Sequence, residues 1–181
     1  VEYLDERNMG DPAVLTDFVV WAVTHYPAEH YALSIWNHGG GWRKTQEDRV
    51  EQAKAAKRAG GEAPAVFRTV CTDDTNGDVL YMREVQDALT SARGLVEGRI
   101  GTKVKLDVVG FDACLMGMVE VAYALRDAAQ YMVGSEMVEP GAGWPYDAIL
   151  GALAATPTMT PATLAGRIVT EYADSYPGQS D

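Results

Sequence analysis

Hydrophobic residues recur along the chain at alternating helical and strand-like spacings. After Asp11-Pro12, apolar side chains follow at helical spacing until Pro27 ends the segment. Further helical patterns cover residues 80–92, 116–129, 146–153 and 161–172, and runs of strand formers cover 31–36, 104–109 and 131–133. This alternation is typical of an α/β domain. It predicts three layers, α/β/α, with a mostly parallel central sheet between helices on both faces.

One polar segment, residues 44–63, interrupts this pattern. It is rich in Ala, Lys, Arg and Glu and has no clear apolar face. Connections of this length without a pattern of their own are usually functional or disordered. We therefore predict an exposed, protease-sensitive loop within one domain that spans residues 1–181.

The composition narrows the possible functions. The chain has 15 Lys and Arg residues against 26 Asp and Glu residues, a formal net charge of -11. A nucleic-acid binder needs a basic face, so this charge argues against nucleic acid as a partner. An acidic surface either attracts cationic substrates or simply keeps the protein soluble. No apolar run is long enough to span a membrane, and no signal peptide is visible.

Two of the predicted strands end in residues that can carry chemistry. One strand leads into His38-Gly39, and another leads into Asp112-Ala113-Cys114. Reactive groups in open α/β sheets collect beyond the carboxyl ends of the strands. If the two strands are parallel, these ends lie at the same edge of the sheet. We therefore expect His38 and Cys114 to approach each other.

This pair of residues suits nucleophilic catalysis by a cysteine. A thiolate attacks a carbonyl carbon, and an imidazole can protonate the leaving amine. The glycines that follow His38 leave backbone N–H groups unshielded, as the stabilisation of an oxyanion requires. Cys114 precedes the helix predicted from Met116, so the helix dipole is expected to favour its thiolate. Cys71 has apolar neighbours and is interpreted as a buried core residue.

Each feature also has a structural interpretation. A lone histidine or cysteine more often belongs to the fold, and consecutive glycines can be a plain turn. The stretch Asp73 to Asp78 resembles a calcium loop, but placing Gly77 at position six puts Thr72 and Arg83 where an EF-hand needs acids. We predict a turn there; a looser calcium site stays open, and no metal ligand is assigned.

At these residues the sequence resembles the clostripain family of cysteine peptidases, which share a caspase-like fold. Residues 31–42, YALSIWNHGGGW, are similar to the family's histidine strand, and residues 110–117, GFDACLMG, to its nucleophile strand. Residues 134–144, GSEMVEPGAGW, resemble the segment that walls the substrate cleft, and residues 8–12, NMGDP, lead into the first helix. The resemblance implies a caspase-like peptidase domain.

The resemblance also implies roles for individual residues. His38 would be the catalytic histidine and Cys114 the nucleophile, and the N–H groups of Gly39 and Cys114 would form the oxyanion hole. Asp112 matches the acid at the base of the S1 pocket, which pairs with Arg or Lys at P1. A partly desolvated carboxylate does need a cationic partner. The implied function is an endopeptidase that cuts after Arg or Lys through a thioester intermediate.

Ser135 and Glu136 match the cleft segment and would bind substrate. Family members are typically secreted by bacteria, which implies a secreted or cell-envelope location, and some need calcium. The family fold has a strand and a helix before residue 8, where this chain has almost nothing. We interpret the chain as a fragment that lacks the N-terminal strand and could also stop short of a C-terminal part.

Two other functions are compatible with the sequence. A non-catalytic relative would be a binding module, although the presence of both His38 and Cys114 counts against it. An unrelated flavodoxin-like domain would bind a small anion at the turn Gly39-Gly40-Gly41, and the acidic net charge weakens that alternative.

Family members mature by cleaving themselves in the loop after the histidine, so we predict self-cleavage within residues 44–63. That loop offers five basic residues, Lys44, Arg49, Lys54, Lys57 and Arg58. N-terminal sequencing of the incubated protein should show a new terminus directly after one of them. A single intact band in active enzyme would contradict this prediction.

Overall fold

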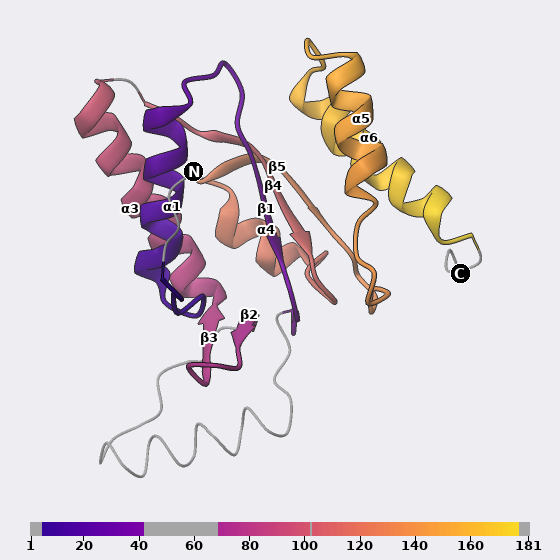
Figure 1. Cartoon of the computed structure of the whole chain (residues 1–181), viewed down its shortest axis with the longest axis horizontal. Coiled ribbons are helices and arrows are strands. Elements are labelled where there is room, and N and C mark those ends of the chain that lie inside the picture. The colour runs from indigo at the N-terminus through magenta and orange to yellow at the C-terminus, as the bar shows by residue number, and fades with distance from the viewer. Residues whose placement is uncertain (1–4, 42–68, 102, 178–181) are drawn as a thin grey trace.

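Three layers make up the structure, a computed structural model that describes residues 5–41, 69–101 and 103–177 (Figure 1). The middle layer is a parallel sheet in the order β1-β4-β5. Its strands are β1 (Ala32–Trp36), β4 (Leu106–Asp112) and β5 (Ala129–Gly134). The predicted parallel sheet is therefore confirmed.

Helices cover both faces of this sheet, as predicted. Figure 1 shows α1 and α3 on one side of the sheet and α5 and α6 on the other. The helices are α1 (Pro12–His25), α3 (Met82–Ile100), α4 (Val119–Leu125), α5 (Tyr146–Ala155) and α6 (Pro161–Ser175). The α4 helix buries its side chains in the same core as α1 and α3. The site discussed below must therefore lie at an edge of the sheet, because helices occupy its faces.

The larger core lies between the sheet and helices α1, α3 and α4. On β1, Leu33 and Ile35 are buried in this core, whereas the residues that alternate with them are exposed. On α1, Val19 and Val23 are buried at helical spacing. Asp11 caps this helix by accepting a backbone N–H with its carboxylate. The periodicity of the sequence thus decides which face of each element turns inward.

A smaller core lies between the sheet and helices α5 and α6. It is formed by one residue of β4, one of β5, a tryptophan in the following loop and one residue of each helix: Val108, Val133, Trp144, Ile149 and Ile168. Gly110 of β4 makes room for the tryptophan, because a Cβ at Gly110 would lie 2.6 Å from the Trp144 ring. This close approach fixes the loop after β5 over the sheet.

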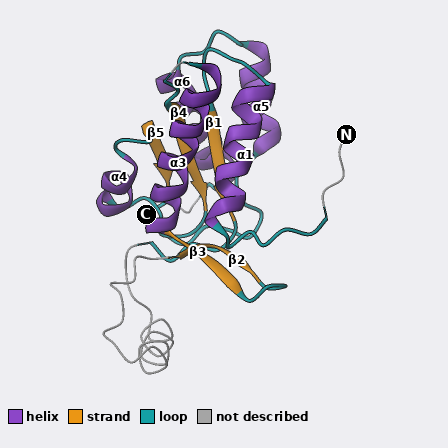
Figure 2. Ribbon diagram, turned by 90° about the vertical axis from the view of Figure 1, so that its left-hand side faces the viewer, coloured by secondary structure: helices purple, strands orange, loops and turns teal. Residues whose placement is uncertain are grey.

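A β-hairpin follows the segment 42–68, and the sequence did not predict it. Its strands are β2 (Thr69–Asp73) and β3 (Asp78–Tyr81), which pair in antiparallel fashion beyond one end of the sheet (Figure 2). The helix predicted from Leu80 begins at Met82 instead. These strands are short and have no clear local pattern. They are stabilised by pairing with each other and with the loop after β1.

Hydrogen bonds fasten the hairpin turn to the start of the chain. The Asp73 carboxylate accepts the N–H of Met9 at 2.8 Å and the N–H of Asn76 at 2.9 Å, and the Asn8 amide donates to Asp78 at 2.7 Å. The bonds from Asn76 and Met9 hold the pKa of Asp73 below its usual range. The oxygens of Asp73 thus tie the hairpin turn to the segment before α1.

Two further predictions concern a helix over residues 116–129 and a loop over residues 44–63. The helix predicted over 116–129 is short, because residues 113–118 form a loop that packs on the end of β5. A Cβ at Gly117 in that loop would lie 2.6 Å from the carbonyl oxygen of Gly134. The predicted loop 44–63 lies outside the described residues. In the described part of the chain, no helix has the length and apolar character needed to cross a membrane.

We predict that Gly110→Ala destabilises the fold by about 1–3 kcal/mol, because the added methyl group forces Trp144 out of its place. Gly94→Ala is the matched control. A Cβ at Gly94 meets nothing within 4 Å, and removing a glycine from a helix interior should stabilise by about 0.5–1 kcal/mol. Urea unfolding of both variants measures this difference. Equal stability of the two variants would show that Trp144 accommodates the added methyl group, and would contradict the prediction.

Candidate active site

The ends of β1 and β4 meet at one edge of the sheet, as their parallel pairing requires. Trp36 lies opposite Asp112 in the register, and the N–H of Asn37 donates to the Asp112 carbonyl at 3.4 Å. Just beyond, the two loops touch, because a Cβ at Gly39 would lie 2.3 Å from the carbonyl oxygen of Cys114. The structure thus brings the histidine loop and the cysteine loop into contact, as the sequence predicted.

Backbone hydrogen bonds hold the His38 loop against strand β2. Cys71 donates its N–H to the His38 carbonyl at 3.1 Å, and Gly40 donates to Thr69 at 3.0 Å. These bonds flank an antiparallel bridge between Gly39 and Val70. In such a pair the N–H of the bridged residue itself points away from the partner strand. The N–H of Gly39 therefore points away from β2 and is available to another acceptor.

Asn37 fixes the backbone directly before His38. Its φ is 127°, a value that non-glycine residues rarely adopt. Its side-chain amide donates to the Thr72 carbonyl at 3.3 Å, and its side-chain oxygen accepts the N–H of His38. The first bond joins the end of β1 to the hairpin, and the second holds the His38 backbone against Asn37.

The Cys114 sulfur accepts a hydrogen bond from the loop after β5. The N–H of Glu139 donates to it at 3.3 Å, so the sulfur lies directly against this loop. The helix predicted from Met116 begins only at Val119, so Cys114 does not directly precede a helix. Leu115, at φ 62°, turns the chain away from the sheet before that helix starts.

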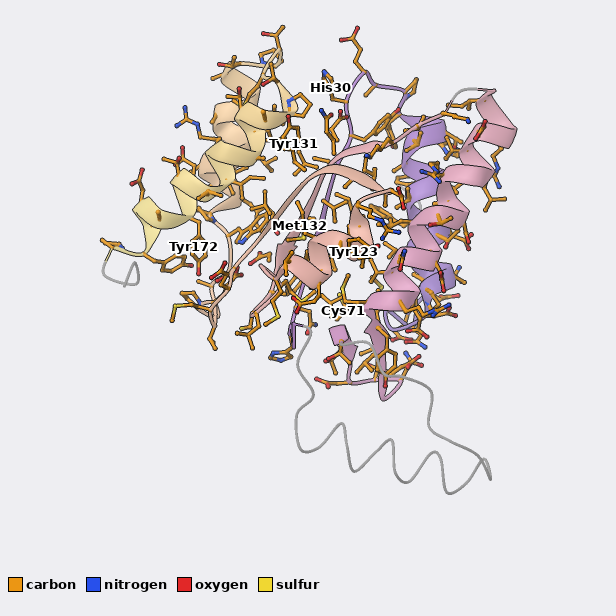
Figure 3. The ribbon with its side chains drawn as sticks, turned by 180° about the vertical axis from the view of Figure 1, so that it is seen from behind. His30, Cys71, Tyr123, Tyr131, Met132 and Tyr172 are labelled. Carbon is orange, nitrogen blue, oxygen red and sulfur yellow. The ribbon has the colours of Figure 1, made fainter. Side chains whose placement is uncertain are left out.

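Cys71 lies near the end of the sheet, at the margin of the larger core (Figure 3). It is half-buried in a β-bulge at φ 60°, and its thiol donates to the Trp36 carbonyl at 3.2 Å. Cys71 therefore packs against the larger core, as predicted, but is only partly buried. Burial raises the pKa of this thiol to about 11, which makes Cys71 a poor nucleophile at neutral pH. Of the two cysteines, Cys114 is the better suited to attack a substrate.

Asp112 is buried beneath the loop that follows β5. Each of its carboxylate oxygens accepts the N–H of Trp144 at 3.1 Å. Gly143 allows this close approach, because its φ is 66° and a Cβ there would lie 2.8 Å from the carboxylate. The loop thus covers Asp112, the last residue of β4.

The Glu139 side chain lies beside Asp112, and no sequence pattern predicted a role for it. Burial, a hydrogen bond with Asp112 and the negative charge of Asp112 together raise its pKa to about 7. Its Oε2 atom is buried and has no hydrogen-bond partner in the described structure. Asp112 and Glu139 are hereafter called the acid pair. Glu139 lies within the predicted cleft segment, but only the turn at 140–143 shows that this acid points inward.

Tyrosines surround the acid pair. The Tyr146 hydroxyl lies 2.8 Å from the Ser34 hydroxyl, and burial raises the pKa of Tyr146 to about 12. Burial does the same for Tyr172, which Figure 3 shows on α6. Tyr176 of the same helix end donates its hydroxyl to the Gly143 carbonyl at 2.7 Å. Partial burial of this kind strengthens the interaction between charges at the acid pair.

Ser135 and Glu136 lie on the loop that borders the Cys114 loop. The Ser135 hydroxyl accepts the N–H of Met137 at 3.0 Å, and its carbonyl accepts the N–H of Gly117 at 2.7 Å. The Glu136 side chain is exposed. Ser135 therefore shapes the loop. In the described part of the chain, no group of three or more His, Cys, Asp or Glu side chains is placed to hold a metal ion.

Comparisons with known proteins identify the family. The sequence profile of the clostripain family matches residues 1–180. Clostripain of Hathewaya histolytica is 36% identical over 155 residues, which are 80% of this chain and 24% of that protein. This chain therefore spans about a quarter of the length of that relative.

Solved structures agree with the profile. A secreted C11 cysteine protease from Bacteroides thetaiotaomicron, in complex with an irreversible peptide inhibitor, has a TM-score of 0.66 at 29% identity, over 95% of this chain and 39% of that one. An inactive zymogen C11 protease from Parabacteroides distasonis has a TM-score of 0.65 at 23% identity, over 99% of this chain and 40% of that one, and supports the fold. With nearly every residue matched, the protein belongs to the clostripain family of cysteine peptidases.

Proposed function

We propose that this cysteine peptidase is an endopeptidase that hydrolyses peptide bonds after Arg or Lys, with Cys114 as nucleophile and His38 as acid and base. The observation that carries the proposal is the acid pair, which lies beside Cys114 and holds one carboxylate oxygen without a partner. The peptide inhibitor bound to the similar secreted protease supports a peptide substrate.

The proposed mechanism follows from the positions of the loops. The Cys114 thiolate attacks the carbonyl carbon of the scissile bond, and the oxygen becomes negative. The N–H groups of Gly39 and Cys114 donate to that oxygen, consistent with the Gly39 N–H pointing away from β2. His38 protonates the leaving amine, and a thioester remains. His38 then takes a proton from water, whose oxygen attacks the thioester and releases the acid and Cys114.

The acid pair accounts for the proposed specificity. Two neighbouring, partly buried carboxyl groups repel each other when both are ionised, which is one cause of the raised pKa of Glu139. A guanidinium or ammonium group would neutralise this repulsion and supply donors for the free oxygen of Glu139. Asp112, held by Trp144, would form the base of the S1 pocket. Ser135 and Glu136 would contact substrate further along the cleft.

The location of the protein is part of the same proposal. The similar Bacteroides thetaiotaomicron protease is secreted. We propose secretion for this protein as well, with exposed peptides or proteins as substrates.

We predict hydrolysis of fluorogenic peptides with Arg or Lys at P1 and at least tenfold slower hydrolysis with Asp or Ala at P1, about the value of one charge-assisted hydrogen bond. Cys114→Ala should abolish hydrolysis, whereas Cys71→Ala should retain it, because the Cys71 thiol has a pKa of about 11. Initial rates at one enzyme concentration give the comparison.

Other outcomes would redirect the proposal. Cleavage after Asp or Ala that Cys114→Ala abolishes would keep the catalytic pair and overturn the S1 assignment. No cleavage by a folded sample would favour a binding module without turnover, and binding of inorganic phosphate at Gly39-Gly40-Gly41 would favour the anion-binding alternative.

We also predict a pH dependence of substrate binding that Glu139 causes. Glu139 is neutral below pH 7 and charged above it, because its pKa is about 7. Binding of a P1-Arg peptide to the Cys114→Ala chain should therefore strengthen about fivefold from pH 5 to pH 8, as a neutral hydrogen bond becomes charge-assisted. Fluorescence anisotropy of a labelled peptide measures the affinity.

The controls separate Glu139 from other titrating groups. In Glu139→Gln the increase in peptide affinity from pH 5 to pH 8 should be smaller, because the amide stays neutral at every pH. Glu120→Gln makes the same change of charge on the exposed start of α4, on the opposite face of the sheet, and should leave the rise unchanged. An equal rise in all three proteins would assign the pH dependence to a group other than Glu139.

A further inference from the structure

Strand β1 presents one large aromatic side chain to the solvent, at the end nearest the site. Leu33 and Ile35 are buried in the larger core, and the alternating residues Ser34 and Trp36 project from the opposite face. The Trp36 side chain is 69% exposed, although tryptophan side chains are highly buried on average. It stands two residues before His38.

The register of the sheet places Trp36 beside the acid pair. Trp36 lies opposite Asp112, and paired residues of neighbouring parallel strands project from the same face. The Asp112 carboxylate meets the Trp144 N–H on that face. The hydroxyl contact between Ser34 and Tyr146 shows independently that the exposed side of β1 faces the start of α5.

The other aromatic groups of this pocket are engaged. Trp144 is buried, with its ring against Gly110 and its backbone N–H on Asp112. The Tyr146 hydroxyl is bound to Ser34. Tyr172 and Tyr176 pack on each other, and the Tyr176 hydroxyl is bound to Gly143. Among these described aromatic residues, Trp36 therefore offers the most open surface next to Asp112.

We propose that Trp36 determines specificity by stacking on the guanidinium of a P1 Arg, so that the site prefers Arg to Lys. The inference rests on the proposed cleavage after basic residues. A guanidinium is planar and weakly hydrated, and it can lie against an indole face while its N–H groups bind a carboxylate. An ammonium is a compact, strongly hydrated charge and gains less from such a surface.

The test compares two peptides that differ only in Arg or Lys at P1. In Trp36→Leu, which keeps the apolar bulk without the ring, kcat/KM for the Arg peptide should fall about three- to thirtyfold, the range of a cation–π contact. The Lys peptide should lose less, so the Arg-to-Lys ratio falls. The loss should appear in KM, since stacking is present before and during the chemical step. Trp36→Tyr should restore most of the ratio.

Trp21→Leu is the matched control, because Trp21 is 44% exposed on the outer side of α1, away from the sheet edge that holds the site. It should leave the ratio unchanged. An unchanged ratio in Trp36→Leu, or an equal loss for both peptides, overturns the role of Trp36. Failure of wild type to cleave either peptide overturns the proposed function instead. In that case, binding of both peptides to Cys114→Ala, with and without Trp36→Leu, still decides the preference.

Discussion

The parallel register between β1 and β4 is the constraint on which the site depends. It sets Trp36 opposite Asp112, and the bond from Asn37 to the Asp112 carbonyl continues the pairing beyond β1. A slip of one residue would turn Asp112 into the apolar core and Phe111 into the pocket. Phe111 is completely buried in the larger core, so its burial opposes the slip. The same apolar side chain that stabilises the fold therefore orients the neighbouring acid.

The loops beyond the strands are held in conformations that the chain would not adopt alone. In the described residues, the non-glycine residues with positive φ are Asn37, Cys71 and Leu115. All three adjoin His38 or Cys114 in sequence or by a hydrogen bond. Such backbone conformations persist only where the surroundings over-determine them. Here the surroundings are the parallel strands, the hairpin and the loop after β5, which lie on three sides of the site.

Local patterns made part of this site predictable. His38 and Cys114 each lie just beyond the end of a strand, so periodicity and one rule about parallel sheets were enough to predict that their loops lie at the same edge. The position of Cys71 was not predictable in this way, because its surroundings depend on a hairpin whose two short strands lack a clear local pattern. The start of α4 was also missed, since the packing of Gly117 on β5 delays the helix although residues 116–118 continue its apolar pattern.

Glu139 shows most clearly what a local pattern leaves out. Nothing in the sequence distinguishes it from Glu136, three residues earlier, yet one side chain is exposed and the other is half-buried against Asp112. Burial and the neighbouring charge both disfavour the ionised form of Glu139. Above pH 7, where Glu139 is ionised, its carboxylate therefore lowers the stability of the folded, unliganded protein. In the proposed function, a cationic P1 side chain would remove that cost when it binds. The repulsion within the acid pair is therefore the physical basis of the proposed preference for positive charge.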